Sequence, residues 1–146
     1  MKSTLTHMLK ELRLSGLMNS LEVRLQEATS NRLTHAEFLE LILQDEMSVR
    51  DERQIERRTR TACFRDQKTL EEFDWDFNRT IRRKLFFDLA SGEFVRQHRD
   101  VLLVGPPGVG KSHLAQAIGH QLIRAGVTVF YRSIFDAVRD LLHDEA

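Results

Sequence analysis

The chain has 146 residues, enough for one ordinary domain or for one small domain and part of another. Hydrophobic residues make up 41% and charged residues 30%, a composition that excludes a mainly disordered chain. Lys and Arg number 22, as do Asp and Glu, so the formal net charge is zero. Contact with DNA would therefore need a local basic patch or an assembly, because the whole chain has no basic excess.

The single cysteine, Cys63, excludes an internal disulfide and a CxxC metal site. We expect it to pack as a small residue on a helix. The sequence contains no apolar run as long as a signal peptide or a membrane-spanning helix. We therefore expect a cytoplasmic protein without a membrane partner.

Residues 1–66 are predicted to form an all-α N-terminal domain that is a candidate for binding DNA or a partner. Apolar residues recur at helical spacing over residues 3–28, where Gly16 interrupts two predicted helices, and a polar connector follows at 29–32. Thr34 and Glu37 have the spacing of a capping box, which predicts a long helix from there to about Cys63.

The second half of this long helix carries many charges of both signs. Glu46 and Arg50, and likewise Glu56 and Arg60, lie four residues apart with the acid first, the favourable order for helical ion pairs. A mixed run of this kind is usually a solvated face. The alternative is a face that contacts DNA phosphates or a partner protein.

Residues 67–100 are predicted to form a connector and a docking helix. Aromatic and acidic residues alternate from 70 to 78, which is typical of a short connector held in place by its rings. A helix follows with Ile81, Leu85 and Leu89 on one side. Its basic cluster at 82–84 is compatible with a membrane surface, but docking on the next domain is the simpler explanation.

Residues 101–146 have the pattern of a partial α/β domain. Residues 101–104 are apolar, as in a parallel strand buried on both faces, and residues 127–131 predict a second strand. Between them we expect a helix that ends near Gly126, and Ser133 opens a last helix. The inward positions of the first helix are predicted to be Leu114, Ala115, Ile118 and Leu122. The expected fold class is thus an α/β P-loop NTPase of AAA+ type with an incomplete parallel sheet, preceded by the all-α domain.

The most informative segment is residues 105–112, Gly-Pro-Pro-Gly-Val-Gly-Lys-Ser, which satisfies the P-loop pattern GxxxxGK[ST]. Glycines without a Cβ let backbone N–H groups approach phosphate oxygens, and the positive end of the following helix points to the same place. Lys111 is predicted to contact the β- and γ-phosphates, and Ser112 to ligate magnesium. The predicted nucleotide-binding residues are Gly105, Pro106, Pro107, Gly108, Val109, Gly110, Lys111 and Ser112.

Two nearby features are not expected to carry chemistry. His113 has no identified acidic partner, and such a histidine is usually structural. Asp144 and Glu145 form an acidic pair, but they end a predicted helix. A Walker B pair ends an apolar strand, so we reject this assignment.

The loop with the residues after it, 105–115, resembles that of IstB-type transposition helper ATPases and of the related DnaC-type helicase loaders. Segments 12–18 and 69–75 also resemble the IstB type, so the similarity covers the whole chain and favours IstB-type proteins. The resemblance implies an AAA+ ATPase that oligomerises on DNA and assists a transposase in target choice. It also implies that 105–112 bind ATP, with Lys111 stabilising the transferring phosphoryl group and Ser112 on magnesium.

Proteins of this family continue into a strand with the Walker B acids, a sensor residue and an arginine finger, and none of these can be matched here. The resemblance therefore implies a truncated form, for which we expect ATP binding without hydrolysis by this chain alone. Residues 101–104 would lack the neighbouring strands of the family, so the α/β part is expected to be marginally stable.

Two other functions stay open at this stage. The chain could be a DnaC-like helicase loader, or a non-catalytic module that binds DNA or transposase and carries a vestigial nucleotide site. A small-molecule kinase is excluded because no room remains after the first βαβ unit for an acceptor pocket and a lid.

Overall fold

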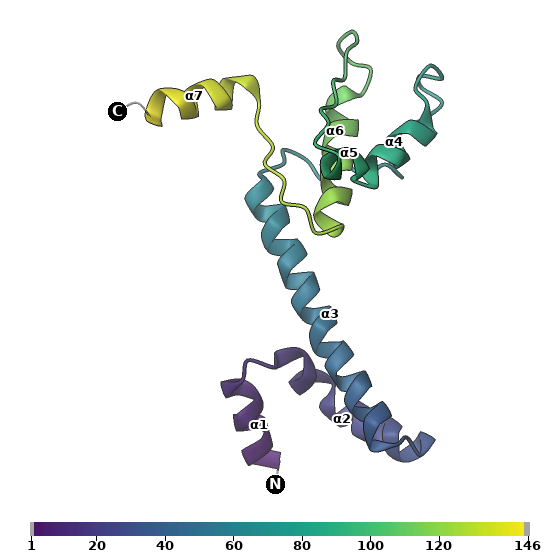
Figure 1. The fold of residues 1–146 in the computed structure, drawn as a ribbon, viewed down its shortest axis with the longest axis vertical. Coiled ribbons are helices and arrows are strands. Elements are labelled where there is room, and N and C mark those ends of the chain that lie inside the picture. Colours follow the sequence, from purple (N-terminus) through teal and green to yellow (C-terminus); the bar gives the residue numbers. More distant parts are fainter. Residues whose placement is uncertain (1, 145–146) are drawn as a thin grey trace. The chain divides into compact units, whose positions relative to one another are not determined.

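The computed structural model of the protein describes residues 2–144, with side chains described over 4–143. Within that range the chain forms seven helices, α1 to α7, and no strand (Figure 1). It divides into two compact units, Met1–Gln54 and Ile55–Ala146, and the division falls inside α3. The domain limits expected at residues 66 and 100 stay predictions.

The first unit contains the two predicted N-terminal helices, α1 (Lys2–Glu11) and α2 (Ser15–Asn31). The break between them lies at residues 12–14 and not at Gly16, and α2 continues through the predicted polar connector. Arg32 ends α2 in a left-handed conformation with a φ of 52°, and its N–H donates to the Ala28 carbonyl. Residues 32–34 therefore join the two helices in place of the expected connector at 29–32.

The long helix α3 (His35–Ala62) begins and ends where the sequence predicted. The Thr34 N–H donates to the Glu37 carboxylate at 2.7 Å, and the Glu37 N–H donates to the Thr34 hydroxyl at 3.3 Å. The predicted capping box is therefore confirmed. The hydrogen bonds that the Thr34 N–H and hydroxyl donate to the Glu37 carboxylate lower the pKa of Glu37. Cys63 follows the helix end at a φ of 56° and is exposed, so the expectation that it packs on a helix was wrong.

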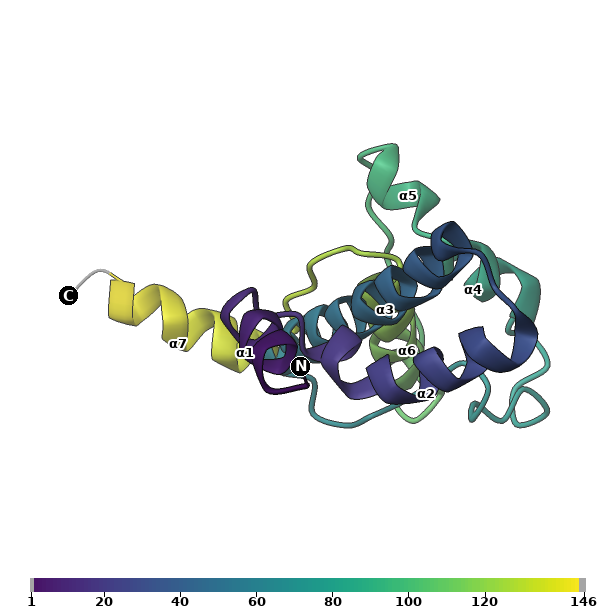
Figure 2. The same cartoon turned by 90° about the horizontal axis from the view of Figure 1, so that it is seen from below.

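A carboxylate from α3 caps the start of α2. Glu46 is only 4% exposed, and its Oε2 accepts the N–H groups of Gly16 at 2.7 Å and of Leu17 at 3.1 Å. These N–H groups lie in the first turn of α2, where no helical carbonyl can pair with them. Burial opposes ionisation of Glu46, but the hydrogen bonds from Arg50, Leu17 and Gly16 outweigh it and lower its pKa. Figure 2 shows α2 running beside this part of α3.

A second ionic contact joins the same two helices. Arg24 of α2 donates to both carboxylate oxygens of Asp45, at 2.9 and 2.8 Å, and also to Glu27 at 2.7 Å. The bonds from Arg24, followed by one from Ser20, lower the pKa of Asp45 to about 2. Two-point arginine–carboxylate pairs fix orientation as well as distance, so this contact sets how α2 lies on α3.

The two helical ion pairs expected on α3 are also present. Arg50 lies 2.8 Å from Glu46, and Arg60 lies 3.3 Å from Glu56. Both members of the second pair are exposed, as on a solvated face, so that pair contributes little to stability.

The close approach of α2 and α3 makes Gly16 a test of this packing. A Cβ at Gly16 would lie 2.9 Å from the Glu46 Cα and 3.0 Å from the Asp45 carbonyl oxygen. Alanine normally stabilises a helix interior by about 1 kcal/mol over glycine. We expect Gly16→Ala to destabilise the first unit instead, by roughly 1–3 kcal/mol, because the backbones must separate. Faster hydrogen exchange in α2 would support this, whereas slower exchange would contradict it.

The Arg24–Asp45 pair predicts an acid-dependent loss of stability. The pKa of Asp45 is about 2 in the folded protein against an ordinary value of 3.8. Ionised Asp45 therefore stabilises the fold above pH 3.8, and this contribution disappears as the pH falls from 3.8 towards about 2. Urea midpoints followed by circular dichroism should fall across this window more steeply for the wild type than for Asp45→Asn. Parallel curves would contradict the prediction.

The second unit is built around α6 (Lys111–Arg124), which packs on α4 (Arg83–Ala90), and α4 leads into the short α5 (Glu93–Arg96). The core comprises Leu70, Phe73, Phe86, Leu114, Ala117, Ile118 and Leu122. Leu70 and Phe73 come from the connector, and Trp75 packs against this core. The predicted anchoring of the connector by its rings is therefore confirmed for Phe73 and Trp75, whereas Phe77 is exposed. The predicted docking of the helix after the connector is confirmed by the packing of α4 on α6.

The α/β fold expected for residues 101–146 is wrong for the structure described here. Residues 101–104 and 127–131 form no strand in the described part of the chain, although the Tyr131 N–H donates to the Ala62 carbonyl at 2.9 Å. Leu102 and Val104 are 86% and 83% exposed, whereas Leu103 packs on the core. A strand exists only through a ladder of hydrogen bonds to a neighbouring segment, and the isolated bond at Tyr131 does not form a ladder. Ala115, expected inside, is exposed as well.

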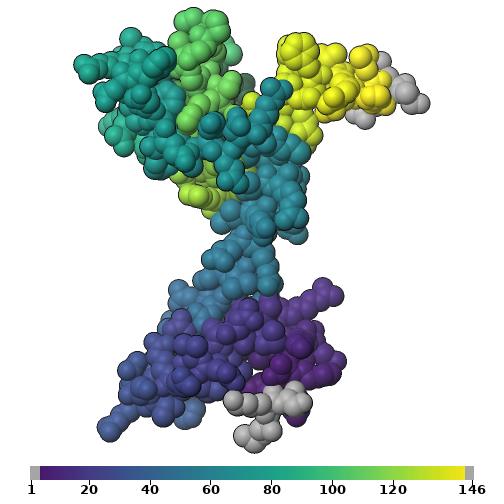
Figure 3. All heavy atoms as spheres, turned by 180° about the vertical axis from the view of Figure 1, so that it is seen from behind, coloured from purple at the N-terminus to yellow at the C-terminus, as the bar shows by residue number. Residues whose placement is uncertain are grey.

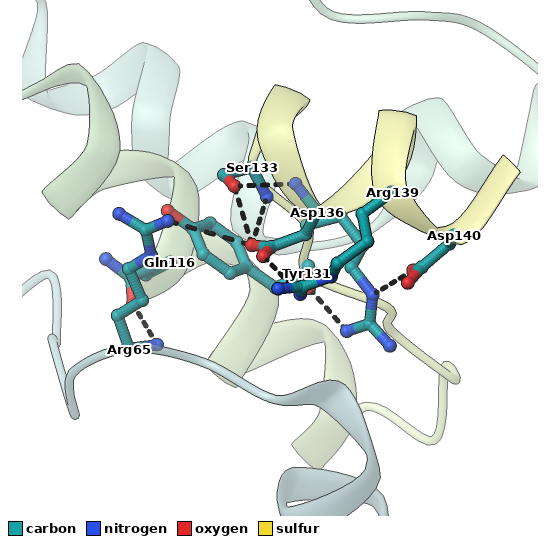
Figure 4. A network of polar contacts seen from close by, with 8 residues as sticks. Arg65, Gln116, Tyr131, Ser133, Asp136, Arg139 and Asp140 are labelled. Atoms are coloured by element: carbon teal, nitrogen blue, oxygen red, sulfur yellow. Dashed lines mark hydrogen bonds and ion pairs between the residues drawn. The ribbon is translucent and has the colours of Figure 1, made fainter. Parts of the chain in front are cut away.

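The last helix, α7 (Ile134–Asp144), begins directly after Ser133 as predicted. The Asp136 N–H donates to the Ser133 hydroxyl at 3.2 Å, and that hydroxyl donates to the Asp136 carboxylate at 2.6 Å. Arg65 reaches the same carboxylate at 3.7 Å, and Arg132 pairs with Asp140 at 3.1 Å (Figure 4). Polar contacts thus hold the helix at its first turns.

The apolar side of α7 is open to solvent. Figure 3 shows the helix in yellow, and its exposed apolar side chains are Ile134, Phe135, Val138, Leu141 and Leu142. Asp144 ends the helix, and Glu145 lies outside the described residues. Across the described part of the chain, none of the helices combines the length and apolar character that a membrane crossing requires.

Candidate functional site

Residues 105–112 lead from the extended segment 101–104 into α6. Gly108 and Gly110 have φ values of 82° and 90°, the left-handed region that favours glycine. The helix begins at Lys111, and the Gly110 carbonyl accepts the Leu114 N–H at 2.9 Å. The predicted glycine-rich turn into a helix is therefore present. It leaves the unpaired N–H groups of the first helical turn at the loop, the arrangement that binds anions elsewhere.

Lys111 turns back onto the loop. Its Nζ donates to the carbonyl oxygens of Gly105 at 2.8 Å and of Pro106 at 2.6 Å. The positive charge thus lies against the backbone of the same eight residues that the sequence singled out. Ser112 is exposed, and no hydrogen bond to its hydroxyl occurs among the described residues.

A cavity of about 460 Å³ opens beside the loop. The loop contributes Gly105, Pro106, Val109 and Lys111, and the other walls are Asn78, Thr80, Ile81, Phe86, Leu102, Leu103, Val104 and Leu114. Asn78 and Thr80 are tied together, because the Asn78 Oδ1 accepts the N–H and the hydroxyl of Thr80 at 3.1 and 2.6 Å. No pattern in the sequence indicated that these two residues would lie beside the loop.

The connector packs directly against the first turn of α6. Phe73 is 8% exposed, and a Cβ at Gly110 would lie 2.5 Å from its ring. The His113 Nε2 lies 2.9 Å from the Thr69 carbonyl oxygen, and its ring meets Phe73 edge-on at 5.1 Å between centroids. The structural role predicted for His113 is confirmed by these contacts. Sequence reasoning placed Phe73 in the connector but missed its contact with the loop.

Gln116 links α6 to the segment that follows α3. Its side chain is buried, and its Oε1 accepts the backbone N–H of Arg65 at 3.1 Å (Figure 4). The backbone N–H of Asp66 donates to the same oxygen, also at 3.1 Å. Its Nε2 donates to the Ser112 carbonyl at 3.2 Å. One buried amide therefore joins the segment after α3 to the loop end of α6.

The described residues around the loop include no cluster of metal-ligating side chains. Nowhere in the described part of the chain do three or more His, Cys, Asp or Glu residues gather closely enough to hold a metal ion. Any divalent ion at the loop would depend mainly on oxygen atoms that a ligand brings.

Comparison with known proteins identifies the family. The sequence profile described as IstB-like ATP binding protein matches residues 7–146. The chain belongs to this IstB-like family. The resemblance found in the sequence is thereby confirmed over nearly the whole chain.

Three relatives of this IstB-like protein are named as proposed ATP-binding proteins of insertion sequences. One from Mycobacterium tuberculosis is 36% identical over 94% of the chain and 55% of its own length. Those of IS21 from Pseudomonas aeruginosa and IS1162 from Pseudomonas fluorescens are 37% and 38% identical. They align with 92% and 84% of the chain, and with 51% and 54% of their own lengths. The chain thus spans about half the length of these curated relatives, whose names favour the IstB type over the DnaC type.

The packing of Phe73 on the loop predicts different effects of alanine at Gly110 and Gly108. Both residues have a left-handed backbone conformation, so alanine at either position should lower the free energy of unfolding by roughly 1–2 kcal/mol. Only Gly110 lies against a ring, because a Cβ at Gly108 would have no atom within 4 Å. We expect Gly110→Ala to lower the unfolding free energy by roughly 1–3 kcal/mol more than Gly108→Ala.

Urea unfolding followed through Trp75, the single tryptophan of the chain, measures this difference. Equal destabilisation by the two alanine variants would argue against a tight contact between Phe73 and Gly110.

Proposed function

We propose that this IstB-like protein binds ATP with magnesium at residues 105–112 and acts as an accessory protein of DNA transposition. The observation that carries the proposal is the loop itself. Two left-handed glycines turn the backbone into the start of α6, and the Lys111 ammonium group lies against the loop. The insertion-sequence names of the relatives support the biological setting.

In this proposal the triphosphate binds to the N-terminal end of α6. The unpaired N–H groups of the first turn donate to phosphate oxygens, and the helix dipole favours the negative charge. The Lys111 Nζ exchanges its bonds to Gly105 and Pro106 for bonds to the β- and γ-phosphates. The flexible lysine stem can make this exchange without moving the helix.

The nucleoside occupies the cavity beside the loop. Its volume of about 460 Å³ is within the range of roughly 300–1,000 Å³ that is usual for small-molecule sites. Ile81 and Leu103 supply apolar walls for a base, and Asn78 and Thr80 supply polar groups. This placement makes ATP a better match than inorganic phosphate alone.

Magnesium fits the residues present, provided that ATP supplies most of its ligands. The Ser112 side chain is exposed next to the helix start, and its hydroxyl is available as a ligand. Magnesium commonly keeps several waters and takes one or two protein ligands plus phosphate oxygens. Bound in this way it would neutralise part of the phosphate charge. That this chain alone does not hydrolyse ATP stays a prediction.

We further propose DNA, a transposase and other copies of the chain as partners, and the cytoplasm as the place of action. The exposed arginines Arg57 and Arg60 on α3 offer charges for DNA phosphates, which a chain of zero net charge needs locally. A mobility-shift assay at increasing salt tests the DNA contact, because phosphate binding weakens as salt rises. If the chain binds DNA but not ATP, the result would favour the alternative of a non-catalytic module with a vestigial nucleotide site.

A calorimetric titration of ATP with magnesium tests the nucleotide proposal. We expect Lys111→Ala to weaken binding by at least about tenfold, because a charge-assisted hydrogen bond contributes roughly 1.5–3 kcal/mol. Lys84→Ala is the matched control, since it removes an equal charge from an exposed position of α4. No binding by the wild type, or equal binding by all three proteins, would refute ATP binding at this loop.

A further inference from the structure

The connector makes two contacts with the first turn of α6 that the nucleotide proposal does not use. Phe73 packs on Gly110, and the Thr69 carbonyl oxygen lies within hydrogen-bonding distance of the His113 Nε2. We call these four residues the connector clamp. We propose that Phe73 is a positioning residue of the nucleotide site and that the connector clamp preforms the loop for a triphosphate. This inference rests on the proposed function, because it concerns the same loop.

The first contact is one of shape. Phe73 is 8% exposed, and its ring lies so close to the Gly110 Cα that a Cβ would be 2.5 and 2.9 Å from two ring atoms. Gly110 has a φ of 90° and is the residue at which the loop becomes helix. A rigid ring against this turn limits the conformations that the otherwise permissive glycine can adopt.

The second contact is polar and lies three residues further along α6. The His113 Nε2 meets the Thr69 carbonyl oxygen at 2.9 Å, and the His113 ring touches Phe73 edge-on. The connector therefore holds the first turn at both of its ends, Gly110 and His113. The N–H groups that would receive phosphate lie between these two fixed points.

The connector clamp is itself supported from behind. Phe73 meets Trp75 edge-on at 4.8 Å between centroids, and the Trp75 Nε1 donates to the Leu70 carbonyl at 3.2 Å. The Arg83 guanidinium of α4 lies 5.8 Å from the centre of the Trp75 ring. Leu70 is fully buried in the core. The ring at the loop is thus attached to the core by a continuous series of contacts.

A preformed loop has a measurable consequence for affinity. When only a fraction of molecules has the binding-competent loop, the apparent dissociation constant rises by the inverse of that fraction. Replacing Phe73 by leucine keeps an apolar side chain in the core but removes the flat ring from Gly110. We then expect the loop to adopt conformations in which the backbone N–H groups of the first turn of α6 no longer point to one phosphate position.

The test compares Phe73→Leu with Phe94→Leu. Phe94 packs against the same core but is not a wall of the cavity beside the loop, so its variant controls for loss of core packing. We expect Phe73→Leu to weaken ATP·Mg binding about tenfold, as when a tenth of molecules stay competent. Phe94→Leu should change affinity less than about twofold. Wild-type affinity in Phe73→Leu, or equal weakening in both variants, would overturn the proposal.

Hydrogen exchange of the nucleotide-free proteins separates this proposal from the ATP proposal. We expect faster exchange at residues 108–113 in Phe73→Leu than in the wild type and in Phe94→Leu. If the wild type binds no ATP, the proposed function fails, while the exchange comparison still decides whether the connector clamp orders the loop. Unchanged exchange at 108–113 would overturn the clamp whatever the nucleotide result.

Discussion

The turn at Gly110 is the constraint on which the second unit depends. There the chain changes from an exposed loop to the central helix of the core, and it does so at a φ that only glycine adopts easily. The Phe73 ring fills the space that a side chain would take. One residue therefore fixes both the direction of α6 and the position of the N–H groups at its start. The buried side of α6 then brings α4 and the connector together.

Two other glycines also allow a close approach between elements, and at the one in the first unit the approaching group is charged. Gly16 lets α3 approach until the Glu46 carboxylate reaches two N–H groups at the start of α2. In α6 the buried Gly119 lies against the Phe64 ring, where a Cβ would be 2.7 Å from a ring atom. In each case the missing side chain lets another element come close. The hydrogen bonds or the ring packing made possible in this way offset the lower intrinsic helix stability of glycine.

Features set by neighbours in sequence could be predicted, and features set by distant partners could not. The Thr34–Glu37 capping box and the loop start of α6 are local, so spacing alone located them. The extended segments were misjudged because an apolar run indicates burial but supplies no partner to pair with. Phe73 and Asn78 lie near the loop only through the packing of the connector. No spacing between residues 73 and 110 encodes that contact.

The position of Lys111 has a consequence for which anions can compete at the loop. Its ammonium group already donates hydrogen bonds to the carbonyl oxygens of Gly105 and Pro106. Only one of its three N–H donors is left for a small anion, whereas a ligand that takes all three has to replace both carbonyl bonds and shed its own hydration. A ligand with a single weakly charged oxygen gains little from that exchange, whereas a chain of linked phosphates offers several oxygens at once. The two carbonyl contacts of Lys111 therefore favour binding of multiply charged ligands over binding of the small anions of the surrounding solution.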